Sequence, residues 1–549
     1  MYNLFSWEIW RIDIKMKTIF KKIILLFLIG FIVNFLYFSQ TQAQIKTDSN
    51  MNDLINKLNF TDLEELSKSK VYSGDLKSKL DYVLYNPIVD NSFGKNNIAI
   101  NNDKKIGDFI RVASWNIDRG LNLDYIKQIF TSPDEMMKKI SDKKVDKVKV
   151  KEQIEVLRKA NIIILNEVDV GMPRTGYKNI AEELAKTLGY NYAFGTEFVE
   201  VDPAHLGLEN NQWSEENILF PKQKYVVDKT KYKGFHGNAI LSQFPLKNVR
   251  IIRLPNYYDW FASEKKKIAE IEYIRREAAE KIFREDVLRE IRQGSRIALL
   301  ADVEIPGLKT PVTIIAIHIE NRVIPKYRNE QIKVLLNAVK NIDNPVILAG
   351  DFNTTGSDGS PTSIQRELYK RLSDPQYIAR QILFYAIPYS VAISSADAVT
   401  NVLRNYKNPA VTSIPVISPN KERNLFLSLQ NYKFNDGGKF DFSGNKDRSL
   451  NGRTHLLANS NQRDLRGFTP TFVFERPLFI CKYKIDWIFV KPTIKTSKDD
   501  NFSSLEPFYG RTLLEMNYAF NKLPSDHSPV TVDLPLNPPL NPEIKTKLK

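Results

Sequence analysis

Residues 109–118 read FIRVASWNID, and this stretch decides the fold class. Its apolar and β-branched residues are typical of a buried strand, and polar residues, Asn116 and Asp118, appear at its end. The same pattern recurs along the chain, for example in VILAGDFN at residues 346–353. Because such runs alternate with helical patterns, the sequence predicts an α/β or α+β core built in layers.

The expected elements follow one another from residue 109 to residue 534. Strands are expected at 109–117, 162–165, 239–241, 312–318, 346–349, 485–490 and 530–532. Helices are expected at 147–159, 180–188 and 328–339, where apolar residues recur at helical spacing. Two insertions interrupt this pattern, a charged helix at 263–292 and a long segment at 355–466. Residues 45–108 are interpreted as an N-terminal extension or linker, and residues 535–549 as a flexible tail.

The first 44 residues have the layout of a secretory signal peptide. Lysines precede an apolar run at 23–38, and small residues at 41–43 stand at the expected cleavage position. We therefore expect an exported protein, periplasmic or extracellular. The alternative is an uncleaved N-terminal anchor, although the run of 16 residues is short for a bilayer span. Met1 and Met16 are both candidate starts of translation.

Composition limits the chemistry that the chain can use. Cys481 is the single cysteine among 549 residues, which excludes an intrachain disulfide, a multi-cysteine zinc site and an iron–sulfur cluster. A metal ion would be held by oxygen atoms or by the five histidines. The formal charge of +15 becomes 15 − 3 = +12 without residues 1–44, which carry five basic and two acidic side chains. This balance permits an anionic partner.

Polar side chains terminate or follow many of the expected strands. They are Asn116, Asp118, Glu167, Asn238, His318, Asp351, Asn353, Asp526 and His527, while Asp486 lies inside another strand. Taken singly, each is most simply a helix cap or a turn residue. Together they can converge at one edge of a sheet, where hard oxygen atoms suit Mg²⁺ or Mn²⁺. Histidines at such a site transfer protons or stabilise charge, and asparagines such as Asn238 donate hydrogen bonds to phosphate oxygens. The set predicts metal-assisted phosphoester hydrolysis.

Two further residues follow the strand that carries Glu167. Arg174 and Tyr177 stand in a loop at 171–177, and a guanidinium fork suits phosphate oxygens, so we predict that they bind substrate. The alternative is a surface loop bonded to its own backbone.

The ordered set of motifs resembles the endonuclease/exonuclease/phosphatase superfamily over residues 109–534, apart from the two insertions. That superfamily includes pancreatic-type deoxyribonucleases, apurinic endonucleases, bacterial sphingomyelinases and inositol-polyphosphate phosphatases. The resemblance implies a four-layer α/β (α+β) sandwich, with two mixed β-sheets flanked by helices and the site at the edge of the sheets. It also implies a divalent metal cofactor, Mg²⁺ or Mn²⁺.

The resemblance further implies a metal-binding group. Glu167 would be a direct ligand, positioned together with Asn116, and Asp526 would lie beside the metal or its water shell. Asp118 matches an acidic residue of the apurinic-endonuclease branch. The chain departs from the family at Asn166, where glutamine is usual, and the shorter side chain is expected to weaken a hydrogen bond.

The remaining motif residues take catalytic and substrate-binding roles under the same resemblance. Asp351 would orient or deprotonate the attacking water, and Asn353 would hold a phosphate oxygen. His318 would stabilise the pentacoordinate phosphorane. Asp486 and His527 would form a buried dyad in which the carboxylate fixes the imidazole tautomer.

The sequence thus predicts a secreted, divalent-metal-dependent phosphoester hydrolase, a phosphodiesterase with nuclease-like activity. Nucleic acid is favoured as the substrate by the positive charge and by the branch that Asp118 resembles. The alternative is a phosphatase or a sphingomyelinase-like phosphodiesterase acting on a phospholipid headgroup; the headgroup is suggested by the expected export and by an apolar stretch at 382–393. A non-catalytic binding module on the same scaffold is a further alternative. We expect a monomer without an obligate protein partner.

Overall fold

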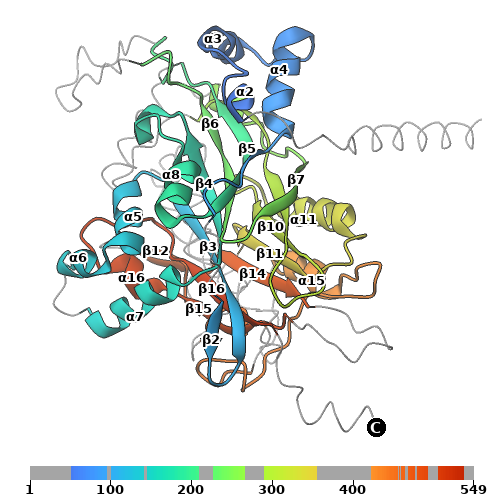
Figure 1. The fold of residues 1–549 in the computed structure, drawn as a ribbon. Coiled ribbons are helices and arrows are strands. Elements are labelled where there is room, and N and C mark those ends of the chain that lie inside the picture. Colours follow the sequence, from blue (N-terminus) through green and yellow to red (C-terminus); the bar gives the residue numbers. More distant parts are fainter. Residues whose placement is uncertain are drawn as a thin grey trace, which may run out of the picture. The chain divides into compact units, whose positions relative to one another are not determined.

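In the computed structural model, two β-sheets pack against each other and helices cover their outer faces (Figure 1). The structure describes residues 51–94, 100–140, 145–203, 205–208, 227–265, 290–354, 422–454, 457, 459–463, 468–476, 479–492 and 505–536. All of these residues belong to one unit, Asn50–Lys549.

The first sheet has nine strands in the order β1-β5-β6-β4-β3-β16-β15, with β2 beside β3 and β8 beside β5. Their bounds are β1 (Ile88–Asp90), β2 (Asn101–Asp103), β3 (Gly107–Arg119), β4 (Ile162–Val170), β5 (Asn191–Glu200), β6 (Phe235–Ser242), β8 (Arg292–Gly294), β15 (Phe508–Thr512) and β16 (Val530–Pro535). Strands β3 and β4 run parallel, whereas β4 and β6 run antiparallel, so the sheet is mixed.

The second sheet has five strands in the order β14-β11-β10-β9-β7. They are β7 (Leu246–Arg253), β9 (Ile297–Val303), β10 (Val312–His318), β11 (Val346–Asp351) and β14 (Asp486–Lys491). Strands β10 and β11 are parallel, and β14 is antiparallel to β11. A separate hairpin pairs β12 (Phe472–Arg476) with β13 (Phe479–Tyr483).

Helices lie on both outer faces. Against the first sheet pack α2 (Met51–Ile55), α3 (Phe60–Lys68), α4 (Gly74–Tyr85), α5 (Leu123–Thr131), α6 (Pro133–Lys138), α7 (Lys147–Arg158), α8 (Ile180–Leu188), α9 (Trp260–Lys265) and α16 (Leu514–Tyr518). Against the second sheet pack α11 (Pro325–Val339) and α15 (Arg423–Asn431). No helix in the described part of the chain is long and apolar enough to cross a membrane.

Alternation along the strands divides the core into layers. In β4, Ile162 and Ile164 face the second sheet, whereas Ile163 and Leu165 pack under the helices of the first. Successive strand side chains point to opposite faces, so a strand covered on both sides is apolar at every position. The predicted four-layer sandwich with two mixed sheets is confirmed.

Each strand and helix expected from the sequence between residues 109 and 534 is present, except that most of the charged helix expected at 263–292 lies outside the described residues. Residues 263–265 belong to α9, residues 266–289 lie outside the described residues, and β8 begins at Arg292. The helix therefore does not extend to its expected end, because Arg292 to Gly294 pair with the edge of β5.

The N-terminal extension is more than a linker. Its helices α2, α3 and α4 bury leucines in the core of the first sheet, and β1 pairs with β5. In the second insertion, residues 355–421 lie outside the described residues, but the aromatic residues after α15 pack under the second sheet. The expected signal peptide and C-terminal tail, residues 1–44 and most of 535–549, also lie outside the described residues.

Strands β10 and β11 approach closely at the end that carries the polar motifs. Gly350 has a φ of 146°, and a Cβ atom there would lie 1.8 Å from the carbonyl oxygen of Ile317 and 3.0 Å from Oδ1 of Asn166. Backbone atoms cannot yield as a flexible side chain can. Glycine is therefore required just before Asp351.

We expect Gly350→Ala to lower the free energy of unfolding by about 3 kcal/mol, because it combines an unfavourable φ with a steric overlap. Urea denaturation monitored by tryptophan fluorescence measures this. Gly307→Ala is the matched control, since Gly307 has a φ of 89° and no atom lies within 4 Å of its added Cβ; it should cost about 1 kcal/mol. Equal costs at the two positions would contradict the steric explanation.

Candidate active site

The motif residues come from the ends of strands in both sheets. Asn116 and Asp118 lie in β3, Glu167 in β4 and His318 in β10, while Asp351 ends β11 and Asp486 begins β14. Asn353 follows β11, and Asp526 and His527 precede β16. Hydrogen bonds and close charge interactions connect all of them, as the following paragraphs describe.

Two bulges expose the carboxylates of the first sheet. The register between β3 and β4 shifts after Asn116, and the register between β4 and β6 shifts after Leu165. At these irregularities Asp118 and Glu167 adopt left-handed conformations, with φ of 45° and 51°. A bulge re-aims the side chains around it. As a result both carboxylates are partly exposed within strands that are otherwise largely buried.

The amide of Asn166 joins the two sheets. Its Nδ2 donates to the carbonyl oxygen of Ile317 at 2.9 Å and to Oδ1 of Asn238 at 2.8 Å, and its Oδ1 accepts from the backbone N–H of Asp351 at 2.8 Å. The expectation that this shorter side chain weakens a hydrogen bond is therefore wrong. The close approach of the two sheets at Gly350 brings the backbone within reach of asparagine.

Asn116 and Asn353 hold Asp351 from two sides. Nδ2 of Asn116 lies 3.3 Å from Oε1 of Glu167 and 3.4 Å from Oδ2 of Asp351, so it bridges a carboxylate of each sheet. The backbone N–H of Asn353 donates to Oδ1 of Asp351 at 2.7 Å, and its side chain donates to the carbonyl oxygen of Ile319. These bonds fix the orientation of the Asp351 carboxylate.

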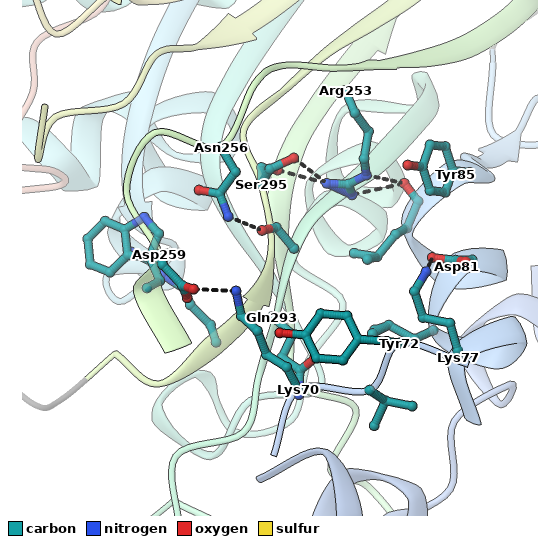
Figure 2. A pocket seen from close by; sticks show the side chains of 16 residues that line it. Lys70, Tyr72, Lys77, Asp81, Tyr85, Arg253, Asn256, Asp259, Gln293 and Ser295 are labelled. Atoms are coloured by element: carbon teal, nitrogen blue, oxygen red, sulfur yellow. Dashed lines mark hydrogen bonds and ion pairs between the residues drawn. The ribbon is translucent and has the colours of Figure 1, made fainter. Parts of the chain in front are cut away.

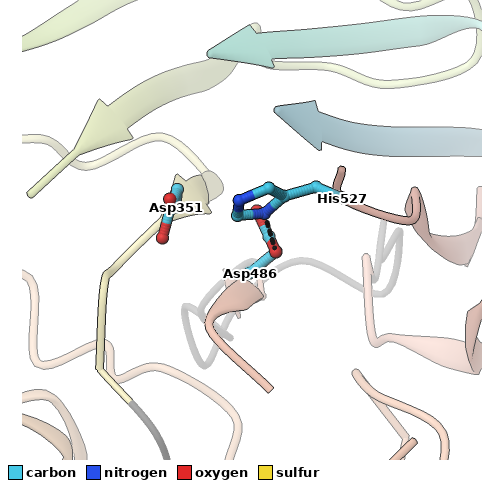
Figure 3. Close-up of side chains that lie close together, drawn as sticks. All are labelled: Asp351, Asp486 and His527. Carbon is cyan, nitrogen blue, oxygen red and sulfur yellow. Dashed lines mark hydrogen bonds and ion pairs between the residues drawn. The ribbon is translucent and has the colours of Figure 1, made fainter. Parts of the chain in front are cut away.

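A buried dyad stands opposite Asp351. Nδ1 of His527 lies 2.9 Å from Oδ2 of Asp486, and Figure 3 shows the three side chains close together. Asp351, Asp486 and His527 offer ligand atoms within 4.8 Å of one another and could hold a metal ion. Among the described residues, Oδ1 of Asp486 has no hydrogen-bond partner although it is buried. Such an oxygen can accept a bond from a ligand.

The electrostatics of the site reflect crowded carboxylates. Burial and the neighbouring Asp526 raise the pKa of Asp118 to about 7, although Arg119 opposes this shift. Burial and Asp486 likewise raise the pKa of Asp351. Each shift records a carboxylate that is costly to ionise beside another one. A divalent cation would relieve this repulsion, so the donor set fits such an ion.

Two other groups are held in their charged forms. Burial alone would raise the pKa of Glu167, but the charge of Arg119 outweighs it and holds this pKa well below its usual range. Burial alone would lower the pKa of His527, but Asp486 and Asp526 raise it well above its usual range. The neighbouring charges therefore favour the ionised form of Glu167 and the protonated form of His527.

Three predicted substrate contacts have other partners. Asn238 is completely buried, and its Nδ2 donates to Oε1 of Glu197 while its Oδ1 accepts from Asn166. Arg174 binds the carboxylates of Asp169 and Glu200 with both sides of its guanidinium. These two side chains support the strand ends from within the fold, and their contact with substrate stays a prediction.

Tyr177 also has partners within the protein. Its hydroxyl accepts the backbone N–H of Asp228 at 2.9 Å, and its ring packs against the core of the first sheet. Its contact with substrate stays a prediction.

The sequence did not single out two arginines of the site. Arg119 contacts both Asp118 and Glu290 at 2.9 Å. Arg296, just before β9, lies 2.7 Å from Nδ1 of His318 and 2.9 Å from Oε2 of Glu197. Arg119 directly follows a motif and could have been noticed. Arg296 stands 22 residues before His318 and carries no local signal.

A separate cavity of about 260 Å³ lies between α4 and the ends of β7 and β8 (Figure 2). Along its wall Lys70 pairs with Asp259 and Lys77 with Asp81, and Arg253 donates to main-chain carbonyl oxygens. None of the predicted site residues lines it. The cavity is therefore distinct from the site described above.

Several solved structures are similar to this chain. An endonuclease/exonuclease/phosphatase from Beutenbergia cavernae is 16% identical over 79% of this chain and 73% of its own, with a TM-score of 0.35. A 3'-5' exonuclease from Neisseria meningitidis is 14% identical over 77% and 99% of the two chains, with a TM-score of 0.36. An endonuclease/exonuclease/phosphatase from Bacteroides vulgatus is 13% identical over 78% and 99%, with a TM-score of 0.34. No curated protein matches the sequence.

The model of the Endonuclease/Exonuclease/phosphatase family matches residues 113–527, which is most of the chain and includes the motifs from Asn116 to His527. Members of this family are phosphoester hydrolases. With the two-sheet fold and the site at its edge, this match leads to one conclusion. The chain belongs to the endonuclease/exonuclease/phosphatase family.

Proposed function

We propose that this protein is a divalent-metal-dependent phosphodiesterase that cleaves nucleic acid. The observation that carries the proposal is the convergence of carboxylates, hydrogen-bonded amides and two histidines at one edge of the two sheets. This edge combines negative groups for a cation with donors for a phosphoryl group. Family membership supports hydrolysis of phosphoester bonds in general.

Glu167, Asp118, Asn116 and Asp526 would hold the metal, Mg²⁺ or Mn²⁺. They supply oxygen atoms, which these hard cations prefer, and their three carboxylates are partly exposed where a ligand can reach them. When bound, the cation neutralises charge on the phosphoryl oxygens and the leaving group. The repulsion that raises the pKa of Asp118 supports this assignment.

Asp351 would orient the attacking water and accept its proton. Its carboxylate is fixed by Asn116 and Asn353, and its raised pKa makes it a better proton acceptor than an ordinary aspartate. Asn353 would also donate to a phosphate oxygen. His527, held protonated by Asp486, would stabilise the negative charge that develops on the phosphoryl group.

Charge supports nucleic acid as the substrate. The chain carries a formal charge of 15 − 3 = +12 after residues 1–44, and release of counterions from nucleic acid favours binding to basic proteins. The apolar stretch at 382–393 that motivates a phospholipid substrate lies outside the described residues. Nucleic acid is therefore the substrate that we propose, and lipid hydrolysis becomes an outcome of the test.

We also propose that the protein acts outside the cytoplasm. The basic and apolar start of the chain supports export. A single cysteine means that the fold does not depend on an intrachain disulfide after export.

We expect the full chain to nick supercoiled plasmid DNA in the presence of Mg²⁺ or Mn²⁺, with activity lost in EDTA and restored by excess metal. Gel electrophoresis measures the nicking, and sphingomyelin vesicles assayed in parallel for phosphocholine release provide the comparison. If the vesicles are cleaved and the DNA stays intact, nucleic acid is the wrong substrate class. Cleavage that persists in EDTA would contradict metal dependence.

We expect Asp486→Asn to reduce kcat by a factor on the order of 10³, because an amide no longer fixes the imidazole tautomer or stabilises its cation. Hydrolysis of bis(p-nitrophenyl) phosphate measures kcat, and differential scanning calorimetry measures Tm. The matched control is Asp441→Asn, which removes a carboxylate paired with Arg448 beside the other end of β14. The control should keep kcat within about twofold, and an equal loss in both variants would show that the dyad has no special role.

A further inference from the structure

Arg296 stands between a buried carboxylate and a histidine of the site. Its Nη1 lies 2.9 Å from Oε2 of Glu197 and 2.7 Å from Nδ1 of His318, and its Nε lies 3.5 Å from Oε2 of Glu320. All four side chains are almost completely buried. The guanidinium is therefore held in one position by carboxylates that do not belong to the motif set.

The direction of the hydrogen bond between Arg296 and His318 is fixed by chemistry. A guanidinium has five N–H donors and no acceptor, so Nδ1 of His318 must accept with its lone pair. The carboxylate of Glu197 lies farther from this ring nitrogen than Arg296 does, with its Oε2 3.6 Å from Nδ1. The imidazole is then neutral, and its single proton is on Nε2.

In this tautomer Nε2 of His318 is a hydrogen-bond donor. It lies 3.7 Å from Oδ2 of Asp351, and among the described residues it has no hydrogen-bond partner although it is buried. A buried N–H donor without a partner is rare in folded proteins. A phosphoryl oxygen beside Asp351 would supply the missing acceptor.

His527 provides the opposite arrangement in the same site. Its Nδ1 is bonded to the carboxylate of Asp486, which favours the protonated ring, whereas Nδ1 of His318 is bonded to a cation, which requires the neutral ring. The group bonded to Nδ1 of each histidine thus determines which protonation state that ring favours. One supplies positive charge, and the other supplies a neutral hydrogen-bond donor.

We propose that Arg296 is a positioning residue that locks His318 in the Nε2–H tautomer, so that His318 donates a hydrogen bond to a non-bridging phosphoryl oxygen of the substrate. The tautomer follows from the geometry alone, and the identity of the acceptor rests on the proposed phosphodiesterase function. In this arrangement His318 takes no proton from the attacking water, which leaves that task to Asp351.

Nitrogen-15 NMR of the full chain labelled only at its five histidines tests the tautomer directly. His318→Gln identifies the signals. We expect one protonated nitrogen, Nε2, and one unprotonated nitrogen, Nδ1, for His318 at pH 7 in EDTA. A proton on Nδ1, or on both nitrogens, would overturn the proposal whether or not the protein proves to be a phosphodiesterase.

Arg296→Met then tests whether Arg296 fixes the tautomer of His318. We expect a second set of His318 signals from the other tautomer and a fall in kcat of about 10²-fold towards bis(p-nitrophenyl) phosphate, with little change in KM. Arg296→Lys keeps a donor and should restore the single tautomer. Arg292→Met is the matched control, because Arg292 is equally buried and also contacts the ring of Phe198, yet does not bond His318.

The outcomes separate the two proposals. An unchanged His318 spectrum in Arg296→Met would overturn the role of Arg296. A changed His318 spectrum with unchanged kcat would overturn the hydrogen bond from His318 to the substrate, but not the role of Arg296 in fixing the tautomer. If Arg296→Met does not fold, the wild-type and Arg296→Lys spectra still decide whether Nδ1 accepts a hydrogen bond.

Discussion

The site depends on one buried amide that bonds both sheets. Asn166 extends from β4 and binds the backbone of β10 at Ile317 and of β11 at Asp351. An unsatisfied amide in the interior would be costly, so these bonds fix the register of one sheet against the other at this edge. Gly350 makes the approach possible, because any side chain there would overlap the backbone of β10. The carboxylates of Glu167 and Asp351 are thereby held on opposite sheets within reach of Asn116.

Charge is distributed unevenly around this edge. The first sheet presents Asp118 and Glu167 at positions that solvent can reach, whereas the second sheet and the segment before β16 bury Asp351, Asp486 and His527. The partly exposed carboxylates suit a cation that arrives from solution, and the buried groups suit proton transfer and charge stabilisation away from water. Hydrolysis of a phosphoester, the reaction of the family, can use both environments at this edge of the two sheets.

The sequence predicted the strands of both sheets and the polar side chains at their ends, because buried strands that end in polar side chains leave a local signal. It did not predict β5, which is buried along its whole length yet carries Glu197 and Glu200. Glu197 pairs with Arg296 and Glu200 pairs with Arg174. These partners lie 99 and 26 residues away in the sequence, so the apolar pattern of the strand gives no sign of them. Asn238, Arg174 and Tyr177 were assigned to substrate for a related reason. Their residue types suit phosphate, but only the tertiary structure reveals that other protein groups already occupy their polar atoms.

The central claim is that Glu167, Asp118, Asn116 and Asp526 form a single divalent-metal site, next to the side chains of the second sheet that would bind the phosphoryl group. Crystals of the protein soaked with Mn²⁺ and inorganic phosphate, with anomalous diffraction recorded at the manganese edge, test it most directly. We predict one strong anomalous peak in contact with the carboxylate of Glu167, with Asp118, Asn116 or Asp526 around it and the phosphate beside Asp351 and His318. A peak elsewhere in the protein, or none near Glu167 in well-ordered crystals, would contradict the account.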